Sequence, residues 1–446
     1  MSQHGIQHGT QHGEQHGKQP VAPQDTDVAA FDIVIIGGGI VGLSFANELI
    51  AADFSVAIIE RNELKAISDQ TSCRVSAINR SALKRFHQTG LLQSLMSQSL
   101  VSQSPLAQRV CLFEKMFVWD QTGAGQIQFD SAELGVPELG AIIENNVLQQ
   151  MLLEKVKAAD NITYLCPQEI TQIDYSLAEG EQAISTQAVS TQAVSAQAAS
   201  TITLSSGKKI QAKLLVGADG VNSNVRKAAA IQRVKQSYQQ QALVCNVTTR
   251  ESHQSTAWQC FMPSGPLAFL PLYNGQSSIV WSLDEAAAQQ TMALDDAAFK
   301  LALAEASEFR LGEIDEVGQR FLFPLSHGHV DDYVKPGLAL IGDAAHNIHP
   351  LAGQGANLGI ADAFALADVI CTARKAGRQW AALHTLSKYQ RQRKGANQLM
   401  EMSMTGFKHL FGGNNVVLSE IRNAGLSLVD HLPALKYRII KQALGV

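Results

Sequence analysis

Two glycine-rich segments near opposite ends of the chain carry residue types that bind a dinucleotide. In the first, Gly37, Gly39 and Gly42 have the G-x-G-x-x-G spacing, in which backbone N–H groups and a helix N-terminus receive a pyrophosphate. The second holds an acidic residue, a proline and further glycines just before a predicted helix: Gly342, Asp343, Pro350, Gly353, Gly355 and Asn357. One glycine-rich loop is a weak signal. Two loops of different kinds point to FAD held at both ends, and therefore to a flavin enzyme.

The first loop lies where a predicted strand passes into a predicted helix. Residues 31–36 form an apolar run typical of a strand buried in a parallel sheet, and residues 43–51 read as a helix. In such a unit Gly37 makes the tight turn, Gly39 lets the pyrophosphate approach the backbone, and Gly42 lets the helix pack closely on the strand.

Two further strand ends carry acidic residues. The predicted strand Val56–Ile59 ends at Glu60, whose carboxylate can accept hydrogen bonds from an adenosine ribose. The segment Lys213–Gly217 leads to Asp219, which can cap exposed N–H groups, while Arg226 can offer its charge to a phosphate. Alone, this middle segment is as consistent with a structural turn as with a binding site.

The C-terminal glycine segment also follows a predicted strand, residues 337–341, and precedes a predicted helix, residues 356–370. At the strand end, Asp343 suits a ribityl or ribose hydroxyl, and the glycines after Pro350 let the backbone lie against a flavin ring. The N-terminus of the helix would stabilise the anionic reduced flavin.

Together these segments resemble the group A flavoprotein aromatic monooxygenases, from about residue 30 to the C-terminus. The string from His349 to Gly359 is similar to the ubiquinone-biosynthesis hydroxylases, as are Arg74–Ile78 and Glu144–Leu148. Within that family, Ser278–Leu283 and the C-terminal part look most like the hydroxylase of 2-polyprenylphenols that acts at ring carbon 5.

The resemblance implies an α/β fold with a Rossmann-like FAD-binding domain of the p-hydroxybenzoate hydroxylase type, an interleaved antiparallel-sheet substrate domain and C-terminal helices. The expected FAD-binding domain comprises residues 29–110, 144–235 and 325–375, with a loop insertion at 185–200. The substrate domain comprises 111–143 and 236–324, followed by a C-terminal helical region, 376–446. Residues 1–28, with a repeated Gln-His-Gly, are expected to be a disordered tail.

The resemblance also implies an activity and a cofactor set. NAD(P)H would bind transiently and reduce FAD, and O₂ would add at flavin C4a to give a hydroperoxide that hydroxylates the ring of a polyprenylated phenol. The residues expected to bind the cofactor are Gly37, Gly39, Gly42, Glu60, Arg74, Asn145, Asp219, Gly342, Asp343, Pro350, Gly353, Gly355 and Asn357. No catalytic acid or base is predicted, because the flavin performs the oxygen transfer. His346 and His349 are better explained as hydrogen-bonded parts of a turn.

On the substrate side, four segments separated by short turns predict an antiparallel meander: Ala242–Thr249, Trp258–Met262, Leu267–Leu272 and Ser277–Leu283. Aromatic residues in and beside these segments either line an apolar site for a prenyl tail or pack in the core: Trp258, Phe261, Phe269, Tyr273 and Trp281.

Composition excludes several other classes of protein. The net charge of −5 at pH 7 and the absence of a basic run argue against binding to nucleic acid. The 6 cysteines are scattered without a Cys-x-x-Cys pair, so neither a metal site nor a disulfide framework is expected. The polar N-terminus is unlike a secretory signal. We expect a cytoplasmic protein, with attachment to the surface of the inner membrane, or to other ubiquinone-biosynthesis proteins, as an option.

Two rival hypotheses remain at this stage. One is a flavin-dependent reductase or dehydrogenase for an isoprenoid or quinone, with a related fold. The other is a non-catalytic, flavin-bound subunit of a quinone-biosynthesis assembly. Consumption of O₂ in proportion to substrate separates the hydroxylase from the first rival.

Overall fold

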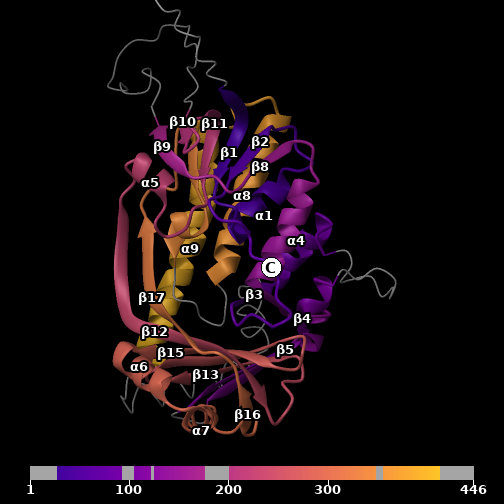
Figure 1. Ribbon diagram of the computed structural model, residues 1–446, viewed down its shortest axis with the longest axis vertical. Coiled ribbons are helices and arrows are strands. Elements are labelled where there is room, and N and C mark those ends of the chain that lie inside the picture. Colours follow the sequence, from indigo (N-terminus) through magenta and orange to yellow (C-terminus); the bar gives the residue numbers. More distant parts are fainter. Residues whose placement is uncertain (1–27, 93–104, 122–124, 176–199, 348–354, 412–446) are drawn as a thin grey trace, which may run out of the picture.

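The computed structural model describes residues 28–92, 105–121, 125–175, 200–347 and 355–411. The N-terminal tail, most of the 185–200 insertion, His349, Pro350, Gly353 and the chain after Phe411 lie outside these described residues. In Figure 1 the strands gather in an upper and a lower sheet, with a smaller sheet between them.

The upper sheet, of 8 strands, contains the parallel strands that lead into the glycine-rich turns. Strand β1 lies at its centre, with β2 and then β8 on one side and β11 and then β19 on the other. The strands are β1 (Ala29–Ile36), β2 (Val56–Ile59), β8 (Ile162–Leu165), β11 (Lys209–Gly217), β19 (Leu338–Leu340), and the antiparallel β9 (Ile170–Tyr175), β10 (Ser200–Leu204) and β18 (Val334–Lys335). The order of strands reverses between β1 and β11, which is where ligands bind in open α/β sheets.

Helices cover this sheet and continue its core. Helix α1 (Ile40–Glu48) packs against both α4 (Asn145–Lys157) and α8 (Gly355–Lys375), and α9 (Leu383–Phe411) packs on α8. The remaining short elements near this sheet are α2 (Arg80–Gln88), α5 (Asn224–Ala228) and η3 (Gly342–Ala344). Helix α8 is apolar and long enough to cross a membrane by length and composition alone, but 61% of its apolar stretch is buried inside the protein, as expected of a core helix.

A small sheet of 3 strands joins the two larger ones: β3 (Val75–Asn79), β4 (Val110–Phe113) and β7 (Gly140–Glu144). Because successive side chains point to opposite faces, Ala141 and Ile143 of β7 belong to the core of the upper sheet, whereas Ile142 belongs to a second core shared with the lower sheet. The small sheet therefore fixes the two larger sheets relative to each other.

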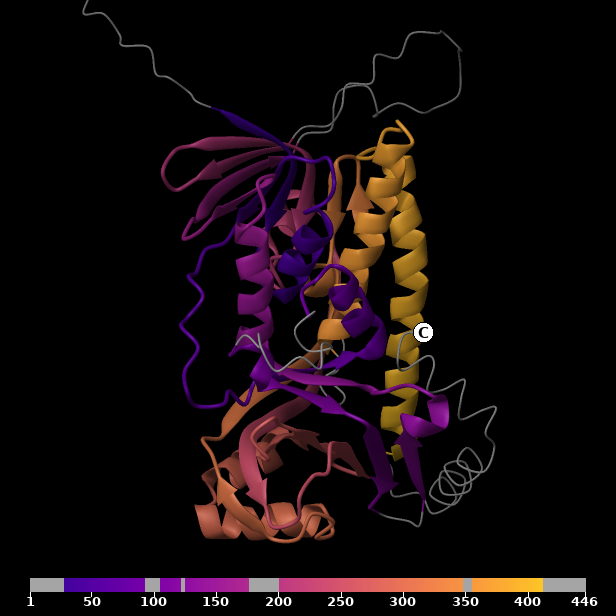
Figure 2. The same cartoon turned by 90° about the vertical axis from the view of Figure 1, so that its right-hand side faces the viewer.

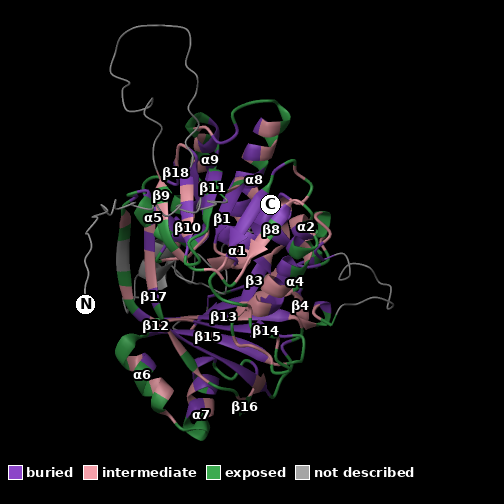
Figure 3. Ribbon diagram, turned by 45° about the horizontal axis from the view of Figure 1, so that its top comes forward, coloured by how far each residue is buried: buried purple, intermediate pink, exposed green. Residues whose placement is uncertain are grey.

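The lower sheet has 9 strands and is mostly antiparallel. Its strands are β5 (Lys115–Asp120), β6 (Gln126–Asp130), β12 (Arg233–Thr249), β13 (Thr256–Met262), β14 (Gly265–Pro271), β15 (Ser277–Asp284), β16 (Ile314–Val317), β17 (Phe321–Val330) and β20 (His346–Asn347). Helices α6 (Glu285–Ala293) and α7 (Asp296–Ala306) lie on its outer side (Figure 3). Short 3-10 turns occur at η1 (Ala107–Arg109) and η2 (Ala132–Leu134).

The meander predicted for this sheet is right for β13, β14 and β15 and wrong for β12. Strand β12 pairs with β15 and not with its neighbour in sequence, β13. The edge of β13 is occupied by β5, which pairs with it in parallel, so β12 must add on the other side of the meander.

Two long strands and one long helix extend beyond a single sheet. In Figures 1 and 2, β12 and β17 run from the upper part of the molecule down into the lower sheet, and α9 follows much of its height. Both strands pass through boundaries predicted between the domains, at 235/236 and 324/325. The division into domains stays a prediction. Strands β12 and β17 run without a break from the upper part of the molecule into the lower sheet.

Candidate functional site

A cavity of about 1560 Å³ lies between the upper and lower sheets. One wall is formed by the turns that follow the parallel strands, which we call the cofactor wall: Gly39, Ile40, Val41, Ala218, Gly220, Ile341, Asp343, Gly355, Ala356, Leu358 and Gly359. The opposite wall, here the strand wall, comes from the lower sheet: Ala242, Val244, Asn246, Val280, Phe321, Phe323, Pro324, Leu325 and Ser326. Ligand pockets generally measure about 300–1,000 Å³, so this cavity has room for a cofactor together with a substrate.

The glycines of the first loop meet two different requirements. Gly37 has φ +110°, and a Cβ there would lie 2.4 Å from the carbonyl oxygen of Ala218. A Cβ at Gly42 would lie 2.1 Å from the carbonyl oxygen of Gly37. In contrast, nothing lies within 4 Å of a Cβ at Gly39, which lines the cavity. The protein itself requires glycine at 37 and 42, whereas at Gly39 the requirement comes from whatever fills the cavity.

Glu60 supports this loop from the end of β2. Its Oε2 accepts a hydrogen bond from the N–H of Gly38 at 2.7 Å, and its Oε1 accepts one from the N–H of Asn62 at 2.8 Å. The carboxylate thus lies beside the glycine loop, as the sequence predicts. Its contact with a ribose stays a prediction.

Asp219 acts as a cap in the structure. Its Oδ2 accepts hydrogen bonds from the N–H groups of Asn224 (2.6 Å) and Val225 (3.2 Å) at the start of α5, while Oδ1 is buried and has no hydrogen-bond partner among the described residues. The prediction that Arg226 meets a phosphate is wrong. Arg226 is buried and donates to the carbonyl oxygens of Ala344 (2.9 Å) and Val221 (2.8 Å), so its guanidinium is committed to the backbone.

The Gly342–Asp343 turn places a carboxylate on the cavity. Gly342 has φ +60°, a left-handed conformation that favours glycine, and Asp343 lines the cavity. Although the Asp343 side chain is open to the cavity, the surrounding protein desolvates it and raises its pKa, against the lowering effects of His346 and Arg233. The turn is well placed for a hydroxyl-bearing ligand, which a carboxylate can bind.

The other C-terminal predictions divide into two groups. Gly355 begins α8 on the cavity, and a Cβ there would meet nothing within 4 Å. The Asn357 side chain is instead used inside the protein: it donates to the carbonyl oxygen of Ala77 (2.7 Å) and accepts from the N–H of Asn79 (3.0 Å). Asn357 therefore ties α8 to β3 instead of presenting its amide to the cavity. As expected, His346 is a hydrogen-bonded part of the turn, with Nε2 at 2.5 Å from Oδ2 of Asp362.

Arg74 and Asn145 meet at the side of the cavity. Both line it, and the N–H of Asn145 donates to the carbonyl oxygen of Arg74 at 2.9 Å. The Arg74 guanidinium lies over the Phe323 ring, 5.4 Å from its centroid, and so connects the side of the cavity to the strand wall. Ser76 donates to Oδ1 of Asn145 at 2.7 Å.

An irregular segment, residues 68–74, which we call the strap, brings Arg74 to this position. A buried ion pair holds it: Arg109 donates to both carboxylate oxygens of Glu144 at 2.8 Å. Arg109 also donates to the carbonyl oxygens of Ser68 and Gln70, and Glu144 accepts from the N–H of Ser72 at 2.6 Å.

The strand wall is mostly apolar, and its polar members are Asn246 and Ser326. Ala242 and Val244 of β12 point into the cavity, while Leu243, Cys245 and Val247 point into the core beneath α6 and α7. The aromatic residues considered for the prenyl site follow the same alternation. Trp258, Phe269 and Trp281 pack in or against that core, and neither Phe261 nor Tyr273 lines the cavity. Core packing, the alternative left open from the sequence, is therefore found for Trp258, Phe269 and Trp281, whereas Tyr273 is exposed.

Several functional side chains were missed by sequence reasoning. Gln149 donates to the carbonyl oxygen of Gly38 at 2.7 Å and thereby fixes the glycine loop from α4. It lies one helical turn after Asn145, and this i, i+4 spacing was a usable signal. Asp362 and Arg393, which lie behind the Gly342 turn, gave only the weak signal of an aspartate within an apolar stretch of α8.

The residues present fit FAD. Gly39 and Gly355 leave space where a Cβ would meet no protein atom, a carboxylate lines the cavity at Asp343, and the N-terminus of α1 follows Gly39 directly. Among the described residues, no group of three or more His, Cys, Asp and Glu is placed to hold a metal ion.

The fold and the cavity together define a FAD-dependent monooxygenase of the p-hydroxybenzoate hydroxylase type. The chain is similar in structure to p-nitrophenol 4-monooxygenase PnpA from Pseudomonas putida, with a TM-score of 0.70 and 17% identity over 93% of this chain and 97% of that one. It is also similar to PqsL, a probable FAD-dependent monooxygenase from Pseudomonas aeruginosa, with a TM-score of 0.69 and 19% identity over 89% and 99% of the two chains.

The model of the FAD binding domain family matches residues 30–403, and the chain belongs to this family of FAD-dependent aromatic monooxygenases. It is 34% identical over 417 residues to 3-demethoxyubiquinol 3-hydroxylase from Escherichia coli, covering 93% of this chain and 98% of that protein. It is also 31% identical over 415 residues to ubiquinone hydroxylase UbiL from Rhodospirillum rubrum, covering 93% and 89%.

Proposed function

We propose that this enzyme hydroxylates the aromatic ring of a polyprenylated phenol in ubiquinone biosynthesis, with O₂ and NAD(P)H as co-substrates. The observation that supports this best is a shared cavity, in which the cofactor wall faces a mostly apolar strand wall. An apolar wall suits a prenylated ring, because burying apolar surface stabilises a bound ligand by about 25 cal/mol per Å². The names of the relatives agree with such a substrate.

Two ring positions compete within this proposal. The likeness of Ser278–Leu283 to a hydroxylase of 2-polyprenylphenols favours carbon 5. The similarity to an enzyme named 3-demethoxyubiquinol 3-hydroxylase, over almost the whole of both chains, favours carbon 3. Both reactions add one hydroxyl group to a prenylated ring, so the same cavity serves either.

The chain's own contribution is binding, orientation and exclusion of water. FAD, when bound, supplies the reduction of O₂ and the transfer of one oxygen atom to the ring. Gly39, Asp343 and Gly355 would hold the cofactor, while Ala242 and Val244 leave space for the ring and keep the surface apolar. His346 is engaged with Asp362 through Nε2 and is given no role in proton transfer.

The first test is a mass-spectrometric profile of prenylated lipids from cells that lack this gene. A prenylphenol lacking one ring oxygen should accumulate, and the site of the missing oxygen distinguishes carbon 5 from carbon 3. Wild-type protein should restore the profile, and Asp343→Ala should not. An unchanged profile in cells without a second hydroxylase of this kind would refute the ubiquinone assignment and leave the flavin monooxygenase class intact.

The location of the protein follows from the same proposal. A polyprenylated substrate resides in a bilayer, so we place the enzyme in the cytoplasm, peripheral to the inner membrane. Fractionation should find it with membranes at low salt and release it at high salt. Recovery entirely in the soluble fraction under both conditions would contradict this part.

A further inference from the structure

Asp362 is a buried carboxylate behind the cofactor wall, and we infer that it is the positioning residue of the Gly342–His346 turn, with Arg393 of α9 as its obligatory partner. This role of Asp362 concerns the binding of FAD alone, whichever ring carbon is hydroxylated.

Asp362 connects the elements that converge behind this turn. Its Oδ2 accepts from the backbone N–H of Gly342 at 3.1 Å and lies 2.5 Å from Nε2 of His346. Its Oδ1 accepts from Nε of Arg393 at 2.8 Å and from Nδ2 of Asn397 at 3.4 Å. One carboxylate thus holds both ends of the turn that carries Asp343, and holds α9 as well.

Close packing of glycines brings Asp362 within reach of the turn. A Cβ at Gly359, three residues before Asp362 on α8, would lie 3.1 Å from Cα of Gly342 and 2.6 Å from Cγ2 of Val41. Because α8 lies so close, the Asp362 side chain reaches the N–H of a glycine in the left-handed region. That conformation directs the next residue, Asp343, to the cavity.

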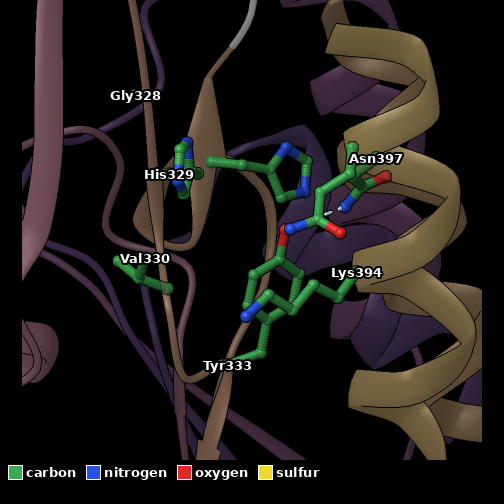
Figure 4. A pocket seen from close by; sticks show the side chains of 8 residues that line it. Gly328, His329, Val330, Tyr333, Lys394 and Asn397 are labelled. Carbon is green, nitrogen blue, oxygen red and sulfur yellow. Dashed lines mark hydrogen bonds between the residues drawn. The ribbon is translucent and has the colours of Figure 1, made fainter. Parts of the chain in front are cut away.

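The charge of Asp362 requires compensation, because the side chain is fully buried. Burial by itself would raise the pKa of Asp362, but His346 and Arg393 outweigh it and hold the pKa below its usual value. Arg393 also donates to Oδ1 of Asn397 at 2.9 Å, and the side chain of Asn397 points toward Tyr333 in Figure 4. Helix α9 therefore completes the cofactor wall from behind.

The experiment compares three full-length variants for FAD affinity and for stability without FAD. Asp362→Asn removes the charge and leaves Arg393 unpaired. The double variant Asp362→Leu with Arg393→Met removes both charges and every acceptor for the turn. Asp368→Asn is the matched control, since Asp368 lies on the same helix and also pairs with an arginine, Arg85, but is exposed.

FAD affinity is measured by fluorescence titration of apo-protein, and the midpoint of thermal unfolding is measured on the same samples. We expect the dissociation constant of FAD to rise about tenfold or more in both Asp362 variants, as for one lost hydrogen bond to a charged group, and to be unchanged in Asp368→Asn. The double variant should regain much of the unfolding midpoint that Asp362→Asn loses, but not the affinity. The FAD that the double variant still binds should have an altered visible absorption spectrum.

A double variant that folds and binds FAD like the wild type would overturn the inference. Amide hydrogen exchange of the wild-type protein tests the role of Asp362 even if both Asp362 variants fail to fold. In apo-protein, the amides of residues 342–346 should exchange with solvent as slowly as those in the middle of α8. Fast exchange of this turn without FAD would show that Asp362 does not hold it.

Discussion

The two walls of the cavity are built from different parts of the chain. The cofactor wall consists of turns whose backbone would receive the cofactor, and in the loop behind it a Cβ added at Gly37 or Gly42 would lie only 2.4 Å or 2.1 Å from a carbonyl oxygen. The strand wall consists of alternate side chains on a regular sheet, such as Ala242 and Val244. A change in the first wall alters the course of the chain, whereas a change in the second alters only the surface that a ligand meets. We therefore expect backbone geometry to specify the cofactor and side chains to specify the substrate.

The largest effect is expected at Gly39. Gly39→Glu should abolish the retention of flavin, because a charged side chain would fill the space left for a pyrophosphate and repel it. The protein should still fold, since no protein atom lies within 4 Å of a Cβ at this position. Purified protein without yellow colour, but with an unfolding midpoint near that of wild-type apo-protein, is the expected result. A yellow, flavin-replete variant would contradict it.

Gly42→Ala provides the comparison within the same glycine-rich loop. Its Cβ would collide with the Gly37 carbonyl oxygen, so both folding and FAD binding should suffer. We expect the free energy of unfolding to fall by about 1–3 kcal/mol, the usual cost of overpacking. If Gly42→Ala is as stable as the wild type, then packing does not require glycine at position 42, and the contrast between Gly42 and Gly39 is wrong.

The strap joins the walls, and breaking its buried ion pair should give the largest effect after that of Gly39→Glu. Arg109→Met leaves the carboxylate of Glu144, whose side chain is 1% exposed, without a charged partner. Removing one member of a buried pair typically costs about 3–5 kcal/mol, and we expect a loss of stability in that range by urea unfolding. The double variant Arg109→Met with Glu144→Leu should recover part of this loss. If the single and double variants are equally stable, the pair does not hold the strap through its charge.

Neighbouring residues of β15 test the alternation of the strand wall. Val280 faces the cavity, whereas Ile279 belongs to the core under α6 and α7. On the proposed function, Val280→Phe should raise KM for the prenylated substrate about tenfold, with FAD affinity unchanged, because it fills substrate space. Ile279→Phe should instead lower stability by about 1–3 kcal/mol through overpacking. The opposite pattern would show that the cavity lies on the other face of the sheet.

Local sequence patterns predicted the cofactor wall well, because strand, turn and glycine signals lie within one short segment. The strand Val56–Ile59 was predicted with the observed bounds, and Glu60 follows it beside the glycine loop. Pairing between distant segments could not be predicted in this way. The pairing of β12 with β15 depends on β5 occupying the edge of β13, and the commitment of Arg226 to Ala344 depends on how the chain folds back.

The smallest effect is expected in the reactivity of two thiols on opposite sides of β12, and it tests which face of the lower sheet lines the cavity. Cys73 lines the cavity, while Cys245 of β12 points away from it into the core. Burial raises the pKa of Cys245 to about 12, and only the thiolate reacts, so at pH 8 a thiol reagent should modify Cys245 only after unfolding. Cys73 is also desolvated, which raises its pKa, and should react slowly in apo-protein. Bound FAD should slow that reaction further, and Cys73→Ser should remove the FAD-sensitive reaction. Reaction of Cys245 before Cys73 in folded protein would place the cavity behind the sheet and reverse the assignment of the two walls.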